Sequence, residues 1–204
     1  MLTGKSKNIA LIILAAGESS RMQQPKQLLP WGKTTLLGHA INVARRSDAK
    51  HVYTVLGANA LAIQQKIDLS NTHCIFNPDW KKGIGASIAS AAQFLLESET
   101  DYDALLFTLC DQPLINAEYL NGMIKAYRNG DKNIIATAYE HGNGVPVLFH
   151  KKFIGELLTL DGDSGAKDII AKNSEEVRTI APHGKQIDLD TYGEYQHLKN
   201  QTNL

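Results

Sequence analysis

Hydrophobic residues fall into short runs that alternate with longer amphipathic stretches up to about residue 130. Ile9–Leu14 is apolar at every position, which predicts a strand buried on both faces of a sheet. Thr35–Arg46 carries its apolar residues at helical spacing and predicts a helix. By the same criteria we expect strands at His51–Leu56, His73–Phe76 and Ala104–Leu109, and helices at Ala58–Ile67, Ser87–Glu97 and Ala117–Arg128, the last capped by Asn116. This alternation predicts right-handed βαβ units and a mostly parallel sheet with helices on both faces.

The pattern changes in the C-terminal part of the chain. Two strand-like runs, Ile134–Tyr139 and Val145–Phe149, flank His141–Gly144, which predicts a hairpin-like β insertion. After them we expect helices at Lys152–Thr159 and Ser164–Lys172, strands near Val177–Ile180 and Gln186–Leu189, and a last helix near Tyr192–Lys199. The chain of 204 residues is 43% hydrophobic, which suits one domain over residues 1–204. The predicted fold is therefore an α/β sandwich with a mostly parallel sheet and a small β insertion.

The charge balance restricts the class of partner. The 21 basic residues equal the 21 acidic ones, so a general nucleic-acid or membrane surface is not expected, although a few local cations could still hold a small anion. Cys74 and Cys110 lie in apolar runs without zinc-ligand spacing, and we expect buried free thiols in a reducing compartment. The apolar run at the N-terminus is far too short to span a bilayer. We therefore expect a cytoplasmic location.

The loop after the first strand has the composition of an anion site. Ala15, Ala16 and Gly17 are small enough for their backbone N–H groups to approach an anion, and Arg21 and Lys26 add two cations. In open α/β sheets, ligands bind at the carboxyl ends of the strands, where this loop lies. The spacing fits neither a P-loop nor a dinucleotide fingerprint, and an ordinary strand-to-helix loop is the alternative.

The order of residues in this loop is more specific than its composition. Leu14–Met22, followed by Pro25–Pro30, resembles the signature of nucleotidyltransferases with a Rossmann-like fold, and most of all that of the molybdenum cofactor cytidylyltransferase family. Gln23 stands where that family usually has glycine. The resemblance implies a three-layer sandwich of the nucleotide-diphospho-sugar transferase type, with nucleotide binding in about 8–130 and acceptor binding in about 131–199. It also implies that the Leu14–Gly17 backbone holds the nucleotide and that Arg21 and Lys26 hold its triphosphate.

Two acidic positions are candidates for binding Mg²⁺. Asp111 directly follows a predicted buried strand, and Mg²⁺ takes one or two protein carboxylates together with phosphate and water oxygens. Leu109–Pro113 resembles the family's metal-binding element, and Asp188–Tyr195 resembles its second acidic element, with changed residues at 192–194. The resemblance implies Asp111 and Asp190 as ligands. Strand alternation would place Asp188 and Asp190 on one side, while a turn-forming or helix-capping role is the alternative for each aspartate.

Three further segments resemble family elements. Asn77–Ser87 implies a site beside the nucleotide base or sugar, formed by Asn77, Gly85 and Ser87, and Gly57 is a weaker candidate there. Gly144–Phe149 and Asp161–Lys167 imply the acceptor side, where Lys167 replaces the usual arginine. The acceptor candidates are Gly144, Pro146, Asp163, Ser164 and Gly165. A glycine-rich helix entry, a tight turn and a capped helix are the simpler explanations of these elements.

The candidate residues contain no Ser-His-Asp set and no nucleophile–base pair, which suits transfer to a phosphate that is already ionised at neutral pH. We expect Arg21, Lys26 and Asp111 to be catalytic, with positioning and charge stabilisation supplying the rate. The resemblance implies that CMP passes from CTP to a molybdopterin-type cofactor with release of pyrophosphate, and that a molybdoenzyme or its chaperone takes the product. A guanylyltransferase, a transferase acting on another acceptor such as a sugar phosphate, and a non-catalytic nucleotide-binding or cofactor-chaperone protein stay open.

Overall fold

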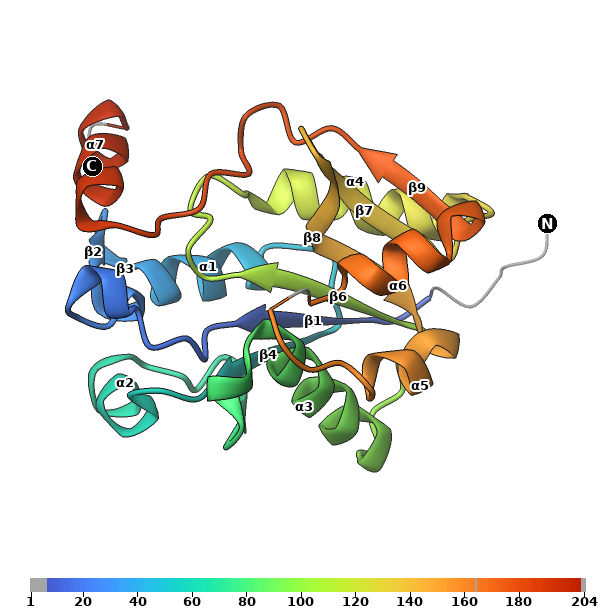
Figure 1. The fold of residues 1–204 in the computed structure, drawn as a ribbon, viewed down its shortest axis with the longest axis horizontal. Helices are drawn as coiled ribbons and strands as arrows, with labels where there is room; N and C mark the ends of the chain where they lie inside the picture. The colour runs from blue at the N-terminus through green and yellow to red at the C-terminus, as the bar shows by residue number, and fades with distance from the viewer. Residues whose placement is uncertain (1–6, 164, 203–204) are drawn as a thin grey trace.

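A seven-stranded sheet forms the centre of the computed structural model, which describes residues 7–163 and 165–202 (Figure 1). Its strand order is β5-β4-β1-β6-β8-β7-β9. The strands are β1 (Ile9–Leu14), β4 (His51–Leu56), β5 (His73–Phe76), β6 (Ala104–Leu109), β7 (Ile134–Tyr139), β8 (Gly142–His150) and β9 (Val177–Ile180). Only β8 runs antiparallel to its neighbours, β6 and β7. The expected mostly parallel sheet with a β hairpin is confirmed.

Helices cover both faces of the sheet, because its central strands are apolar on both sides. In β1, Ile9, Leu11 and Ile13 contribute to one hydrophobic cluster, whereas Ala10, Ile12 and Leu14 contribute to the other. The first cluster is covered by α1 (Leu36–Arg45), α2 (Ala60–Lys66) and α4 (Ala117–Asn129). The second is covered by α3 (Ile84–Glu97), α5 (Ile154–Leu157) and α6 (Lys167–Lys172). The result is the expected three-layer α/β sandwich.

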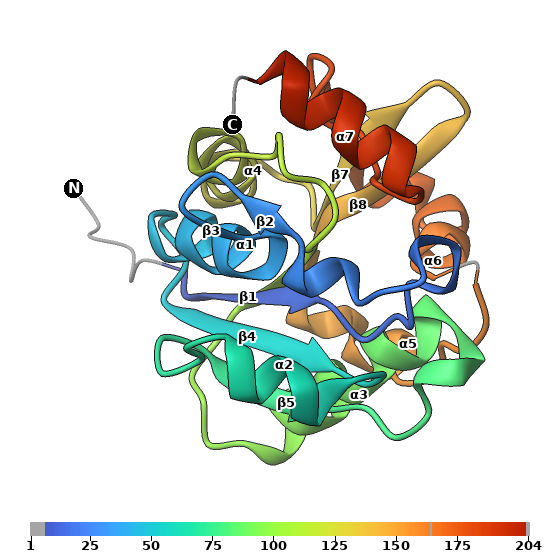
Figure 2. The same ribbon diagram turned by 90° about the vertical axis from the view of Figure 1, so that its left-hand side faces the viewer.

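A third, smaller hydrophobic cluster attaches the last helix, α7 (Tyr192–Gln201). A short hairpin of β2 (Pro30–Trp31) and β3 (Thr34–Thr35) packs against it, and the Tyr195 hydroxyl donates a hydrogen bond to the Pro30 carbonyl at 2.7 Å. Figure 1 shows α7 to one side of the central sheet, and in the turned view of Figure 2 it is drawn in front of β7 and β8. The segment leading into α7 passes the end of β6, where the Leu189 N–H donates to the Asp111 carbonyl. This cluster therefore places the C-terminal acidic residues beside the first loop.

Most of the predicted elements are confirmed, including the Asn116 cap, whose side chain accepts a hydrogen bond from the Tyr119 N–H. The predicted strand at Gln186–Leu189 is wrong, since the segment forms only the single sheet-like bond to Asp111, and β9 ends the sheet. Cys110 is buried as expected, but Cys74 is exposed because β5 is the edge strand. Within the described part of the chain, five short 3-10 turns complete the order: Ser20–Met22, Lys26–Leu28, Trp80–Lys82, Lys151–Phe153 and Ser174–Glu176.

The remaining differences lie at the ends of elements, and β8 begins at Gly142, three residues before the predicted start. α3 begins three residues before the predicted start, at Ile84, directly after Gly83, whose φ of 102° suits glycine. The helix predicted at Lys152–Thr159 is shortened to α5 because a 3-10 turn takes its first residues. Across the described residues, none of the helices combines the length and apolar character needed to cross a membrane.

Candidate active site

The loop after β1 forms one wall of a cavity of about 280 Å³ at the carboxyl ends of β1 and β6. Seven of the residues predicted to bind nucleotide line it: Leu14, Ala15, Ala16, Gly17, Lys26, Ser87 and Asp111. Side chains of Gln27, Trp80 and Ile84 complete much of its surface. The structure thus brings together residues that lie up to about a hundred positions apart in the sequence.

Gln27 holds the loop in shape, and the hydropathy pattern does not reveal it. Its side chain is fully buried, and its amide nitrogen donates to the carbonyls of Ala15 and Gly17, each at 2.9 Å. Ser19 adds a second tie, since its hydroxyl accepts a hydrogen bond from the Lys26 N–H at 3.0 Å. Because the carbonyls of Ala15 and Gly17 accept hydrogen bonds from Gln27 behind the loop, the path of the backbone beside the cavity is fixed.

Three predicted nucleotide residues lie behind the cavity and support it. Gly57 packs so closely that a Cβ there would stand 2.5 Å from the Trp80 Cβ, so glycine lets Trp80 reach the cavity wall. Asn77 is buried and donates to the Ser87 hydroxyl at 3.0 Å. Gly85 lies against the backbone of Asp161. Their contacts are with the protein, and they set the positions of the residues that line the cavity.

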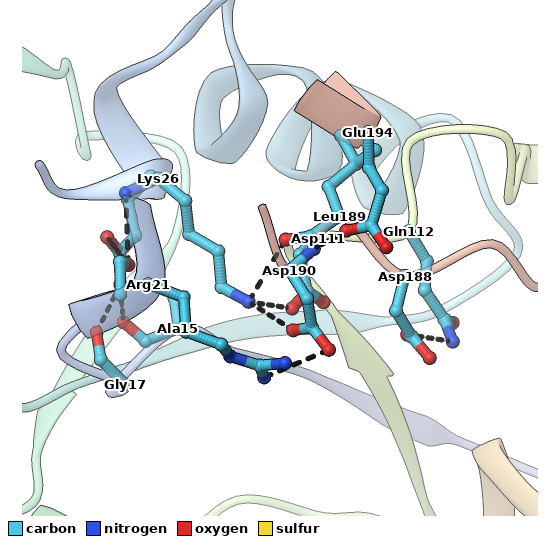
Figure 3. Close-up of polar contacts among 12 residues, drawn as sticks. Ala15, Gly17, Arg21, Lys26, Asp111, Gln112, Asp188, Leu189, Asp190 and Glu194 are labelled. Atoms are coloured by element: carbon cyan, nitrogen blue, oxygen red, sulfur yellow. Dashed lines mark hydrogen bonds and ion pairs between the residues drawn. The ribbon is translucent and has the colours of Figure 1, made fainter. Parts of the chain in front are cut away.

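Lys26 lies between the two carboxylates that were expected to bind metal (Figure 3). Its ammonium forms an ion pair and hydrogen bond with Asp111 and lies 3.6 Å from Asp190, while Arg21 pairs with Asp190 at 3.0 Å. Burial by itself would lower the pKa of Lys26, but the charge and hydrogen bond of Asp111 outweigh it and the pKa is raised. The ammonium therefore stays charged at neutral pH. The ion pairs thus join four side chains into one charged cluster: Arg21, Lys26, Asp111 and Asp190.

The same cluster has the donor set for a divalent cation. The Lys26 ammonium already lies between Asp111 and Asp190, which shows that a positive charge fits there. The second oxygen of Asp111 is buried without a hydrogen-bond partner. Among the residues that the structure describes, no three His, Cys, Asp or Glu side chains gather around one point. A site of two carboxylates completed by phosphate and water oxygens is the arrangement that Mg²⁺ favours. The residues present fit that ion.

Asp190 is placed by its neighbours in the chain and by α7. Leu189 is fully buried in the third cluster, and its N–H bonds to the Asp111 carbonyl at 3.0 Å. Thr191 and Glu194 form a capping box at the start of α7, and the Glu194 carboxylate also accepts the N–H of Asp190 at 3.0 Å. Capping geometry therefore does the positioning that the predicted strand was expected to do.

A second cavity of about 420 Å³ adjoins the first and shares Ile84, Leu109 and Asp163 with it. Of the predicted acceptor residues, Gly144, Asp163 and Gly165 line it. Pro146 lies buried inside β8 behind a cis peptide bond, so Val145 lines the cavity instead, and Ser164 lies outside the described residues. The structure therefore places the hairpin and the 161–167 loop around one space.

Three polar residues that sequence reasoning did not assign to the acceptor side also line the second cavity: Gln112, Tyr139 and Asp188. The Gln112 amide donates to the Tyr139 hydroxyl at 2.8 Å and to Asp188 at 2.9 Å. Loss of water around the carboxylate and the nearby charge of Asp111 raise the pKa of Asp188. Gln112 and Asp188 lie in the two segments that resemble acidic elements of the family, but only the fold brings them close to Tyr139.

Residues 11–177 match the model of the MobA-like NTP transferase domain. The chain belongs to this family. It is 32% identical over 120 residues to the bifunctional protein GlmU of Pseudomonas fluorescens, but it spans only 25% of that relative's length. It is 30% identical over 166 residues to the nicotine blue oxidoreductase of Paenarthrobacter nicotinovorans, covering 76% of this chain and 78% of that one. The family assignment confirms the resemblance inferred from the sequence and supports an enzyme of the nucleotidyltransferase type.

Solved structures with 28–29% sequence identity share the fold. The structure of Rv0371c from Mycobacterium tuberculosis is 29% identical to this chain and superposes with a TM-score of 0.82, covering 96% of this chain and all of that one. A second structure of Rv0371c is a complex with manganese, at 28% identity, a TM-score of 0.76 and coverage of 94% and 98%. The fold class is thereby confirmed over nearly the whole chain.

Proposed function

We propose that the protein transfers CMP from CTP to the phosphate of a molybdopterin-type cofactor, releases pyrophosphate and uses Mg²⁺. One observation carries the proposal: Arg21, Lys26, Asp111 and Asp190 form one charged cluster, Lys26 and Asp111 of this cluster line the cavity under the first loop, and the cavity under the β7–β8 hairpin adjoins that cavity. Two polyanionic substrates can then meet end to end at a point rich in charge. We also expect a cytoplasmic enzyme that passes its product to a molybdoenzyme or its chaperone.

The bond changes need no general base in the protein. An oxygen of the acceptor phosphate forms a bond to the α-phosphorus of the nucleotide, and the bond from that phosphorus to the bridging oxygen breaks, so its electron pair leaves with pyrophosphate. The acceptor phosphate has a second pKa of about 6 and is ionised at neutral pH. Lys26 and Arg21 would hold the triphosphate and offset the charge that develops on pyrophosphate. A Mg²⁺ ion held by Asp111 and Asp190 would polarise the α-phosphate and reduce repulsion between the two substrates.

The choice of CTP rests on a single position. Ala16 is buried and lines the cavity, and alanine there is the pattern of the cytidylyl branch that the loop resembles, whereas the guanylyl branch tends to carry a second glycine. The Ala16 methyl group is therefore the residue-level support for cytidine. GTP with the same acceptor, or another phosphorylated acceptor such as a sugar phosphate, is the nearest alternative.

The test is an assay of pyrophosphate release with each of the four nucleoside triphosphates, with molybdopterin or a sugar phosphate as acceptor, and with or without EDTA. We expect release with CTP, molybdopterin and magnesium, and loss of release with EDTA. Asp111→Asn should lower kcat/KM by about 10³-fold because it removes a charged metal ligand. Asp131→Asn, at an exposed position away from both cavities, should leave it unchanged. A clear preference for GTP would contradict the cytidylyl assignment.

A second candidate comes from the nicotine blue oxidoreductase, which shares 30% identity over most of its length. An oxidoreductase would transfer electrons, for example as a hydride, to or from its substrate and would release no pyrophosphate from a nucleoside triphosphate. The Lys26–Asp111–Asp190 cluster favours transfer, because hydride transfer does not call for a charged cluster of this kind at a phosphate loop. Binding of CTP without pyrophosphate release, with any acceptor, would instead indicate a non-catalytic nucleotide-binding or cofactor-chaperone protein.

A further inference from the structure

Asp188 is a carboxylate that forms no ion pair within the ranges 7–163 and 165–202. The charges of Asp111 and Asp190 repel it, and the charge of Lys26 attracts it more weakly. The charge of two neighbouring carboxylates favours a ligand that brings hydrogen-bond donors to Asp188, which is an exposed residue. The position of Asp188 on the wall of the second cavity suggests where those donors come from.

Gln112 fixes which atoms of this wall face a ligand. The Val145 carbonyl can only accept, so the Tyr139 hydroxyl donates to it and must accept from the Gln112 amide nitrogen. The other hydrogen of that nitrogen goes to one oxygen of Asp188 at 2.9 Å. Gln112 is only 3% exposed, whereas Asp188 is an exposed residue, so Gln112 holds the carboxylate from the buried side and leaves it open to the cavity. The second oxygen of Asp188 accepts no hydrogen bond from any described residue and is available to a ligand.

Asp188 is not part of the candidate metal site that Asp111 and Asp190 form. No set of three acidic, His or Cys side chains among the described residues could share one ion, so Asp188 does not complete the Asp111–Asp190 pair. Figure 3 shows Asp190 turned toward Arg21 and Lys26, whereas Asp188 lies beside Gln112. The cavity wall combines apolar Ile84, Leu109 and Val145 with polar and charged residues that include Glu140, Asp163 and Lys167. Such a space suits a flat heterocycle with polar groups at one edge.

We propose that Asp188, held by Gln112, recognises the acceptor by accepting hydrogen bonds from two adjacent N–H groups at the edge of a planar heterocycle. A 2-amino-4-oxopyrimidine ring presents this pair, and a pterin and a guanine both contain it. The inference rests on the proposed function, since it assigns the pterin of the acceptor to the second cavity. Asp188 is on this basis a specificity-determining residue that acts on the ring, away from the phosphate that reacts.

Equilibrium dialysis of the full-length protein with pterin and with lumazine tests the proposal without any turnover. Lumazine has a carbonyl oxygen where pterin has its amino group. This oxygen can only accept hydrogen bonds, so it would face the Asp188 carboxylate without a donor between them and repel it. We expect the wild-type protein to bind pterin at least about tenfold more tightly than lumazine, because hydrogen bonds to a charged group are strong. In Asp188→Asn, Gln112 still donates to the remaining oxygen, the new NH₂ group faces the cavity, and the preference should reverse toward lumazine.

The matched control is Glu140→Gln, which neutralises another carboxylate on the same cavity wall and should keep the pterin preference. Unchanged circular dichroism and CTP affinity in Asp188→Asn show that the variant folds. Equal binding of pterin and lumazine by the wild type, no binding of either, or a retained pterin preference in Asp188→Asn overturns the proposal. Tighter binding of guanosine than of pterin would assign the edge to a nucleotide and also overturn it.

The outcomes separate this inference from the proposed function. A pterin preference that depends on Asp188, in a protein that releases no pyrophosphate from CTP and molybdopterin, would support the recognition and contradict the transfer reaction. Transfer to molybdopterin by a protein that does not distinguish pterin from lumazine would do the opposite.

Discussion

At the scale of single residues, Gln23 shows what the change from the family pattern means physically. Its φ of 56° lies in the left-handed region, where glycine is favoured and a side chain is strained. Gln23 is exposed and ends the short turn Ser20–Met22, which carries Arg21 toward Asp190. The fold thus keeps the turn that glycine would make and tolerates a residue that fits it less well.

Gln23→Gly should therefore stabilise the protein. Relief of the left-handed conformation is worth about 1–2 kcal/mol, and the extra flexibility of glycine in the unfolded chain costs about 0.5–1 kcal/mol, so we expect the free energy of unfolding to rise by up to about 1 kcal/mol. Urea denaturation measures it. Gln24→Gly, next door and without a positive φ, should lower the free energy of unfolding instead. A loss of stability in Gln23→Gly larger than in Gln24→Gly would show that the Gln23 side chain makes a stabilising contact.

At the scale of elements, the segment before α7 explains how two carboxylates that are close in the sequence, Asp188 and Asp190, reach two different sites. Leu189 is fully buried between Asp188 and Asp190, so the side chains on either side of it are directed away from the third cluster. Asp190 reaches Arg21 and Lys26, and Asp188 reaches Gln112. A single apolar side chain thus anchors one residue for the metal site and one for the second cavity.

Leu189→Ala should loosen both acidic residues. Removing a fully buried leucine side chain weakens the attachment of this segment by about 2–5 kcal/mol. We expect kcat/KM for pyrophosphate release to fall at least about tenfold and Mn²⁺ to bind more weakly in a metal titration, while the far-UV circular dichroism of the sheet and main helices is kept. Ile187→Ala is the matched control, because that side chain is 41% exposed in the same segment. Equal effects of the two variants would argue against an anchoring role for Leu189.

At the scale of the whole molecule, stability is distributed unevenly. The two large clusters pack on either face of the sheet and include β1 and β6, whereas α7 is held by a third cluster of seven buried side chains in the described part of the chain. Apolar burial is the main stabilising term, so a small cluster opens at lower free energy than a large one. One carboxylate of the candidate metal site lies in the less stable part and the other follows β6.

Hydrogen exchange followed by mass spectrometry should show this difference. Amides of α7 are expected to exchange by local opening, faster than those of β1 and β6, which need global unfolding. Addition of CTP with magnesium should slow exchange in α7, because a metal bound by Asp111 and Asp190 would link the two parts. CTP with EDTA serves as the control. If α7 and β1 exchange at the same rate in the free protein, the third cluster is an integral part of the main core.

Local patterns in the sequence were sufficient for the layers of the fold. The apolar run of β1, the helical spacing of α1 and the Asn116 cap depend on residues a few positions apart, so their interactions can be anticipated without knowing the path of the chain. The order of residues in the first loop and around Asp111 was specific enough to indicate the family. The predicted strand at Gln186–Leu189 failed because alternation alone does not show whether a sheet has an open edge nearby.

Tertiary structure decided which of these residues form one site and what each one contacts. Lys26 meets Asp111 across 85 positions, and Gln112 meets Asp188 across 76. Those encounters follow from the strand order and from the attachment of α7, which no periodicity records. The same holds for Gln27 behind the loop and for Gly57, Asn77 and Gly85 behind the cavity. The sequence by itself determined a nucleotide-binding α/β fold, because that depends on local periodicity and motif; the roles of its polar side chains depend on distant partners and became visible only in three dimensions.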